Sequence, residues 1–118
     1  MPGNPWFIST LWLARYRLLR SHTVEDLARG LELIEWAARR ALPSGVMAEQ
    51  LHPYTGEPLS VSPLTWSHAA YVRVVREYLD RTAQLNRCPT CGHETGRTAR
   101  LTDRLTAITE PHEFERQP

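Results

Sequence analysis

The chain has 118 residues, of which 42% are hydrophobic and 23% are charged, as in an ordinary globular protein of one domain. The formal net charge is +1, so the chain lacks the positive field that binding to nucleic acid or an anionic membrane requires. No apolar run reaches the roughly eighteen residues of a membrane span, and the N-terminus lacks the features of a signal peptide. We therefore expect a cytoplasmic protein with no nucleic-acid and no membrane partner.

The first predicted element is a helix with Asn4 at its N-cap and Pro5 at its first helical position. Between residues 6 and 13 only Ser9 and Thr10 are polar, and the first charged residue is Arg15. A helix with this pattern is buried on most of its circumference, so it needs packing partners on nearly every side.

The second predicted helix is amphipathic. Thr23 and Asp26 have the spacing of a capping box, and apolar residues then recur at three- and four-residue steps across residues 24–38. Pro43 and Gly45 end the pattern. Charged residues lie on the other side of this helix, which is typical of a solvated face.

Residues 43–62 contain three turns bounded by Pro or Gly and no periodic pattern, so we expect no regular structure there. A connection of about twenty residues is usually functional when it is ordered. Its first half holds a single carboxylate, Glu49. Ser62 and Pro63 then repeat the N-cap signature, and a third helix is predicted to run to about Arg81.

Two sequence blocks resemble those of a known family. Residues 45–50 (GVMAEQ) and 59–70 (LSVSPLTWSHAA) resemble the last conserved block of glycoside hydrolase family 15, the glucoamylase family. Residues 4–14 (NPWFISTLWLA) resemble the block just upstream of it. The blocks occur in the right order at the right separation, so the resemblance is specific, and it covers about residues 4–80.

The resemblance implies an all-α fold, because the family forms an (α/α)6 barrel of about twelve helices. Residues 1–83 account for about three of these helices, so we expect the C-terminal part of the catalytic domain, with the N-terminal part of the barrel missing. Residues 84–118 lie outside the resemblance and are expected to form a poorly structured tail.

The resemblance implies an inverting enzyme. It also implies that the enzyme hydrolyses α-glucosidic bonds from the ends of an α-glucan or oligosaccharide. Such hydrolysis uses one carboxyl group as general acid and another as general base. The family's base is the Glu of the Ala-Glu-Gln motif, which is Glu49 here. The general acid lies far upstream, so the chain alone is expected to be inactive. Trehalose-cleaving members differ at residues 64–68, which favours a glucan substrate.

Four further residues are candidates for the same site. In the family a serine after the motif hydrogen-bonds the base, and this position is Ser60, unless its hydroxyl simply faces water. Trp66 and Trp6 either line the sugar site or belong to the core. Gln50 donates either to a sugar hydroxyl or to the loop backbone.

The tail holds Cys88 and Cys91, followed by His93, in a pattern that resembles a zinc knuckle. A structural zinc site needs four ligands, and these residues supply at most three. An unmetallated turn and redox or disulfide chemistry are the alternatives. No cofactor is expected for catalysis. The rival function is a small, non-catalytic helical module whose tail binds zinc and recruits a partner.

Overall fold

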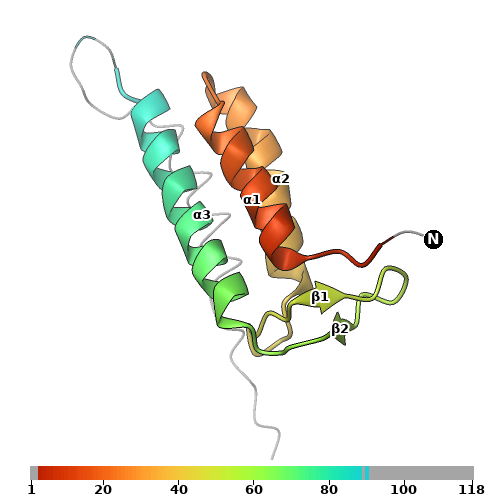
Figure 1. The fold of residues 1–118 in the computed structure, drawn as a ribbon. Coiled ribbons are helices and arrows are strands. Elements are labelled where there is room, and N and C mark those ends of the chain that lie inside the picture. The colour runs from red at the N-terminus through yellow and green to blue at the C-terminus, as the bar shows by residue number, and fades with distance from the viewer. Residues whose placement is uncertain (1–2, 89, 91–118) are drawn as a thin grey trace, which may run out of the picture.

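A computed structural model of the chain describes residues 3–88 and residue 90 (Figure 1). The elements of this part are, in chain order, α1 (Phe7–Leu19), α2 (Val24–Arg40), β1 (Gln50–Leu51), β2 (Pro58–Leu59) and α3 (Thr65–Leu85). The predicted all-α class is confirmed. The two strands lie together at one end of the helices (Figure 1).

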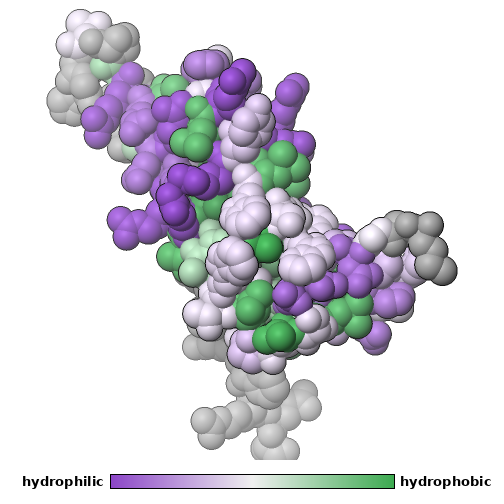
Figure 2. Space-filling model, in the orientation of Figure 1, coloured by the Kyte–Doolittle hydropathy of each residue, from purple (hydrophilic) through white to green (hydrophobic). Residues whose placement is uncertain are grey.

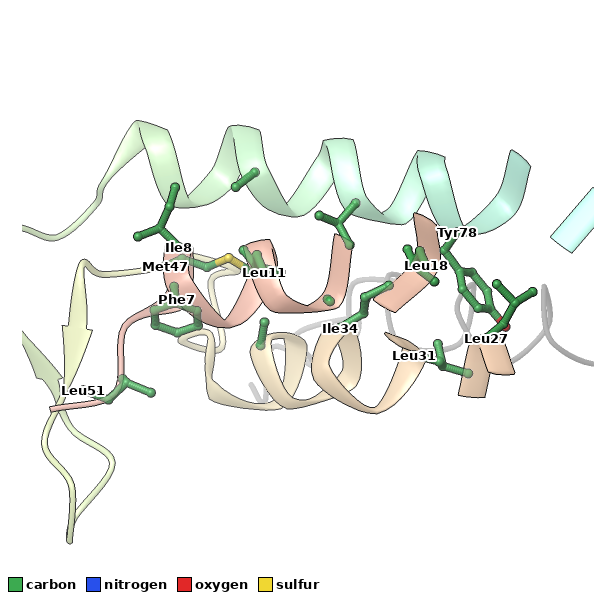
Figure 3. Packing of buried hydrophobic residues seen from close by; sticks show 14 residues of the cluster. Phe7, Ile8, Leu11, Leu18, Leu27, Leu31, Ile34, Met47, Leu51 and Tyr78 are labelled. Carbon is green, nitrogen blue, oxygen red and sulfur yellow. The ribbon is translucent and has the colours of Figure 1, made fainter. Parts of the chain in front are cut away.

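The hydrophobic core lies where α1 packs against both α2 and α3. It extends from Leu51 and Phe7 near the strands to Leu27 and Tyr78 at the far end of the helices (Figure 3). None of these four side chains is more than 1% exposed. Full burial of a large apolar side chain contributes about 1.5–3 kcal/mol, so this continuous core accounts for the association of the helices.

The helix α2 forms as predicted from local sequence. The Thr23 hydroxyl accepts a hydrogen bond from the Asp26 N–H at 3.2 Å. The Asp26 carboxylate in turn accepts one from the Thr23 N–H at 3.1 Å, which completes the capping box. The helix ends before Pro43, and Gly45 has a φ of 79°, a left-handed conformation that glycine adopts without steric cost.

The start of α1 differs from the prediction, because its N-cap is Trp6 and not Asn4. The residues before the helix are extended and pair with β1. The Leu51 N–H donates to the Pro5 carbonyl at 2.9 Å, and Trp6 forms a β-bridge to Gln50. The pairing with β1 therefore overrides the local N-cap signal.

The bounds of α3 also differ from the prediction. Its N-cap is Leu64 and not Ser62, and the helix continues to Leu85 instead of ending near Arg81. The Leu64 N–H donates to the Met47 carbonyl at 3.0 Å. A distant backbone group thus fixes the start of α3.

The prediction of no regular structure in residues 43–62 was wrong for four of them. The strands β1 and β2 are antiparallel, with Gln50 opposite Leu59 and Leu51 opposite Pro58. Strands of two residues are too short to show an alternating pattern, so sequence periodicity did not reveal them.

Part of the apolar surface of α1 and α3 is exposed. The exposed large apolar residues of these two helices are Trp12, Leu13, Tyr16, Leu19, Trp66, Val72 and Leu79. On the face shown in Figure 2, the most hydrophilic residues gather toward the end of the helices away from the strands. The sequence predicted that α1 is buried on most of its circumference. The helices α2 and α3 bury only part of that apolar surface.

Within the described residues, no helix combines the length and the apolar character that crossing a membrane requires.

Candidate active site

Glu49 lies at the strand end of the molecule, in the connection between α2 and α3 that we call the Glu49 loop (residues 43–64). Its backbone is held from two sides. The Glu49 N–H donates to the Val61 carbonyl at 2.9 Å, and the Glu49 carbonyl accepts from the Phe7 N–H at 3.3 Å. The loop backbone is therefore tied to the first residue of α1.

The first turn of α3 holds the residues just before Glu49. The buried Ser67 hydroxyl donates to the Ala48 carbonyl at 3.0 Å. The Met47 N–H donates to His68 Nε2 at 3.0 Å, so the imidazole holds the loop backbone through this nitrogen. Both α1 and α3 thus fix the position from which the Glu49 side chain projects.

Two side chains donate hydrogen bonds to the Glu49 carboxylate, and both bonds end on Oε2. One donor is the Ser60 hydroxyl, and the other is Gln50 Nε2 at 3.4 Å. The Gln50 Oε1 accepts a hydrogen bond from Asn4 Nδ2 at 3.0 Å. Among the described residues, Glu49 Oε1 receives no hydrogen bond, so this oxygen is available to accept a proton from water.

None of the ion pairs within the described part of the chain includes the Glu49 carboxylate. The ion pairs there are Arg15–Glu77, Arg73–Glu77 and Arg39–Glu35. Glu49 is therefore not held by an arginine within the described residues.

Ser60 reaches Glu49 from a backbone conformation that is rare for a residue with a Cβ atom. Its φ is 65°, in the left-handed region, which costs about 1–3 kcal/mol. Strain of this kind persists where surrounding contacts impose it, and it clusters at functional sites. Here the adjacent Val61 carbonyl is fixed by the Glu49 N–H.

The two predicted tryptophans lie on the surface of the described part. Trp66 is 58% exposed, and its ring meets that of Trp12 edge to face, with the centroids 5.7 Å apart. Trp6 is 40% exposed and pairs with Gln50 through the β-bridge. Trp12 is exposed although its place in an apolar run predicts burial, so nothing in the sequence indicated it at this surface.

Glu49 is not among the residues that line the hollow of about 710 Å³ along α3. The lining residues of this hollow are Thr65, His68, Ala69, Val72, Arg73, Arg76, Glu77 and Asp80. Glu49 is instead half-buried at the end of the helices.

The predicted zinc ligands lie mostly beyond the described residues. Cys88 follows α3 and is half-buried, whereas Cys91 and His93 are outside the described part. Among residues 3–88 and 90, no group of three or more His, Cys, Asp or Glu side chains is arranged to hold a metal ion. The zinc site stays a prediction from the sequence.

Comparison with known proteins matches part of this chain to one family and to one curated relative. The model of the family described as "Glycosyl hydrolases family 15" matches residues 23–76, a segment that contains Glu49, Ser60 and Trp66. An uncharacterised glycosyl hydrolase of Methanocaldococcus jannaschii is 36% identical over 84 residues, which cover 64% of this chain and 14% of that relative. No solved structure matches the chain significantly.

Proposed function

We propose that this chain is the part of an inverting α-glucan hydrolase of glycosyl hydrolase family 15 that supplies the general base, Glu49, as the family match over residues 23–76 supports. The main support is the state of one carboxylate. Two neutral donors hold Glu49 at Oε2, no ion pair described in this part of the chain engages it, and its Oε1 is left for water.

In the proposed reaction, Glu49 Oε1 takes a proton from a water molecule while the water oxygen bonds to the anomeric carbon. The glycosidic carbon–oxygen bond breaks on the opposite face of the sugar, and a general acid gives its proton to the leaving oxygen. A base must be ionised and correctly oriented. The hydroxyl of Ser60 and the amide of Gln50 serve the second need, because their hydrogen bonds hold the Glu49 carboxylate in place.

The general acid belongs to the rest of the catalytic domain in this proposal. The chain spans 14% of the length of the M. jannaschii relative, so most of a relative of that size lies beyond the matched region. An inverting enzyme holds its two carboxyl groups about 6.5–9.5 Å apart, with a water between. We propose that the other helices of the (α/α)6 barrel bring the acid to the far side of the sugar and cover the exposed apolar surface of α1 and α3.

Trp66 and Trp6 are the proposed contacts to the sugar. Both side chains are exposed and lie in segments bonded to the Glu49 loop. Flat apolar rings pack well against a pyranose face. The Gln50 amide already bonds to Glu49 and Asn4, which supports a role in holding the base over a role as the main sugar donor.

The test is a reconstituted enzyme, in which residues 3–88 of this chain replace the aligned segment of a full-length family 15 glucoamylase. Glu49→Gln should lower kcat on maltooligosaccharides by about 10²–10⁴-fold and leave KM within a few-fold. Proton NMR should show that the first glucose released from the parent enzyme is the β anomer. The isolated chain should release no glucose.

The matched control is Glu57→Gln, which changes an exposed carboxylate of the same loop that bonds to Thr55 of its own turn. Its activity should equal that of the parent. Activity that survives Glu49→Gln within about tenfold, or initial release of the α anomer, would contradict the proposed role of Glu49.

A further inference from the structure

We propose that Asn4 is a positioning residue for Glu49, which acts through the side-chain amide of Gln50; this inference rests on the proposed function of Glu49. Asn4 lies before α1 and Gln50 in β1, so the contact joins segments that are 46 positions apart in sequence. The sequence pattern predicts Asn4 as the N-cap of a helix. In the structure it takes no part in capping, because the N-cap is Trp6.

The contact is one step of a chain of two hydrogen bonds. Asn4 Nδ2 donates to Gln50 Oε1 at 3.0 Å, and Gln50 Nε2 donates to Glu49 Oε2 at 3.4 Å. A glutamine amide has an acceptor end and a donor end, whereas an ionised carboxylate only accepts. The Gln50 amide supports Glu49 only when its donor end faces the carboxylate.

With its own amide nitrogen facing Gln50, Asn4 favours that orientation. If the Gln50 amide turned over while Asn4 kept its orientation, the Gln50 oxygen would face the Glu49 carboxylate and its nitrogen would face the Asn4 amide nitrogen, so one hydrogen bond would be lost at each end. With Asn4 donating to Oε1, the orientation that serves Glu49 is favoured at both ends of the amide. The bond from the Leu51 N–H to the Pro5 carbonyl keeps Asn4 beside β1.

The second donor to Glu49 explains why the orientation of the Gln50 amide matters for catalysis. A carboxylate held only by the Ser60 hydroxyl can rotate about that single contact. The added bond from Gln50 fixes the rotation and thereby the direction of Oε1, the oxygen that takes the proton. Loss of Asn4 should therefore affect the chemical step more than substrate binding.

The first test compares variants in the reconstituted enzyme. Asn4→Ala should lower kcat about three- to tenfold with KM nearly unchanged. The reason is that the bond from Gln50 to the charged Glu49 carboxylate is weakened in this variant but not fully lost. Asn4→Asp keeps the shape of the side chain but offers no donor to Gln50 Oε1, so its kcat should fall at least as far. Thr55→Ala, which removes an exposed hydrogen bond within the same loop, should leave kcat unchanged. Equal kcat in Asn4→Asp and the parent would overturn the inference.

A double-mutant cycle tests whether Asn4 acts through Gln50. Gln50→Ala alone should lower kcat about tenfold. On that background, Asn4→Ala should add less than about a twofold loss, because the route of its influence is already removed. Two losses that simply multiply would show that Asn4 acts by another path and would overturn the inference.

The third test needs no activity. In proton–nitrogen NMR spectra of the 118-residue chain, Asn4→Ala should move the Gln50 side-chain amide resonances toward those of a solvated amide, and Thr55→Ala should not move them. Unchanged Gln50 resonances in Asn4→Ala would overturn the relay, even if Glu49 is the base. Activity that survives Glu49→Gln would instead overturn the proposed function, so the two failures are distinguishable.

Discussion

The helix α2 and the Glu49 loop are neighbours in sequence, but different kinds of contact determine their structures. The start of α2 is fixed by a capping box between Thr23 and Asp26, and its packing by its own apolar period. The Glu49 loop is fixed by partners from elsewhere, above all Phe7 of α1 and Ser67 of α3. The geometry of the candidate site therefore depends on how α1 and α3 pack, and only indirectly on α2.

The strongest way to test this contrast is to remove the buried side chain of Phe7, the residue whose backbone N–H holds the Glu49 carbonyl. Phe7 is fully buried, its ring packs against Trp36 with centroids 5.8 Å apart, and its N–H donates to the Glu49 carbonyl. Phe7→Ala should lower the free energy of unfolding by about 3–5 kcal/mol in urea titrations, or abolish the cooperative transition. The control Leu13→Ala removes a half-exposed side chain of the same helix and should cost clearly less. Equal losses would contradict the assignment of Phe7 as the link.

The same contrast explains which parts of the structure the sequence could predict. The capping box and the apolar period of α2 are local signals, and both were read correctly. The start of α1 was misplaced, because pairing of Pro5 and Trp6 with β1 overrides the cap signal at Asn4. A cap signal carries no information about a strand that forms 46 positions away.

The candidate site shows the same limit. The family resemblance named Glu49 and Ser60, which the structure places in hydrogen-bond contact. It gave no sign of the Asn4–Gln50 bond or of the ring contact between Trp12 and Trp66. These contacts join elements that become neighbours only when the helices pack. The spacing of residues within one segment therefore cannot predict them.

The second prediction concerns the bond between α3 and the loop. Ser67→Ala removes the hydroxyl that donates to the Ala48 carbonyl, and Ala48 is only 2% exposed. An unpaired buried carbonyl should lower the free energy of unfolding by about 1–3 kcal/mol. In the reconstituted enzyme kcat should fall as well, because Ala48 precedes the base. Ser62→Ala, at an exposed hydroxyl of the same loop, should change neither quantity. A loss of stability without any change in kcat would show that this bond does not position Glu49.

The third prediction concerns the local contacts of α2. Thr23→Ala removes the N-cap hydroxyl and should cost about 1 kcal/mol of stability. Amide hydrogen exchange should speed up in the first turn of α2, whereas the amides of Met47 and Leu64 in the loop should exchange as before. Thr65→Ala is the matched control, because Thr65 begins α3 without capping it. Equal acceleration of the loop amides would show that α2 and the Glu49 loop unfold together.

The smallest expected effect is the pH dependence of the same cap. Backbone hydrogen bonds from the His22 and Thr23 N–H groups, with a smaller contribution from the Thr23 hydroxyl, lower the pKa of Asp26 below its ordinary value of 3.8. Because the folded-state pKa is the lower one, the ionised Asp26 contributes its full stabilisation above pH 3.8 and loses it as the pH falls through the folded-state value. Asp26 is exposed, so screening by salt should reduce the effect.

Asp26→Asn isolates that contribution, since the amide keeps a hydrogen-bond acceptor but does not titrate. The parent should unfold at a higher urea concentration than the variant at about pH 6, and the difference should shrink toward zero at about pH 2. The kcat of the reconstituted enzyme at about pH 6 should be the same for both, because the cap lies at the end of α2 away from Glu49. A difference in urea midpoint that persists at low pH would show that the carboxylate acts by shape and not by charge. A change in kcat would show that the cap of α2 affects the geometry of the Glu49 loop. The two regions would then not be independent.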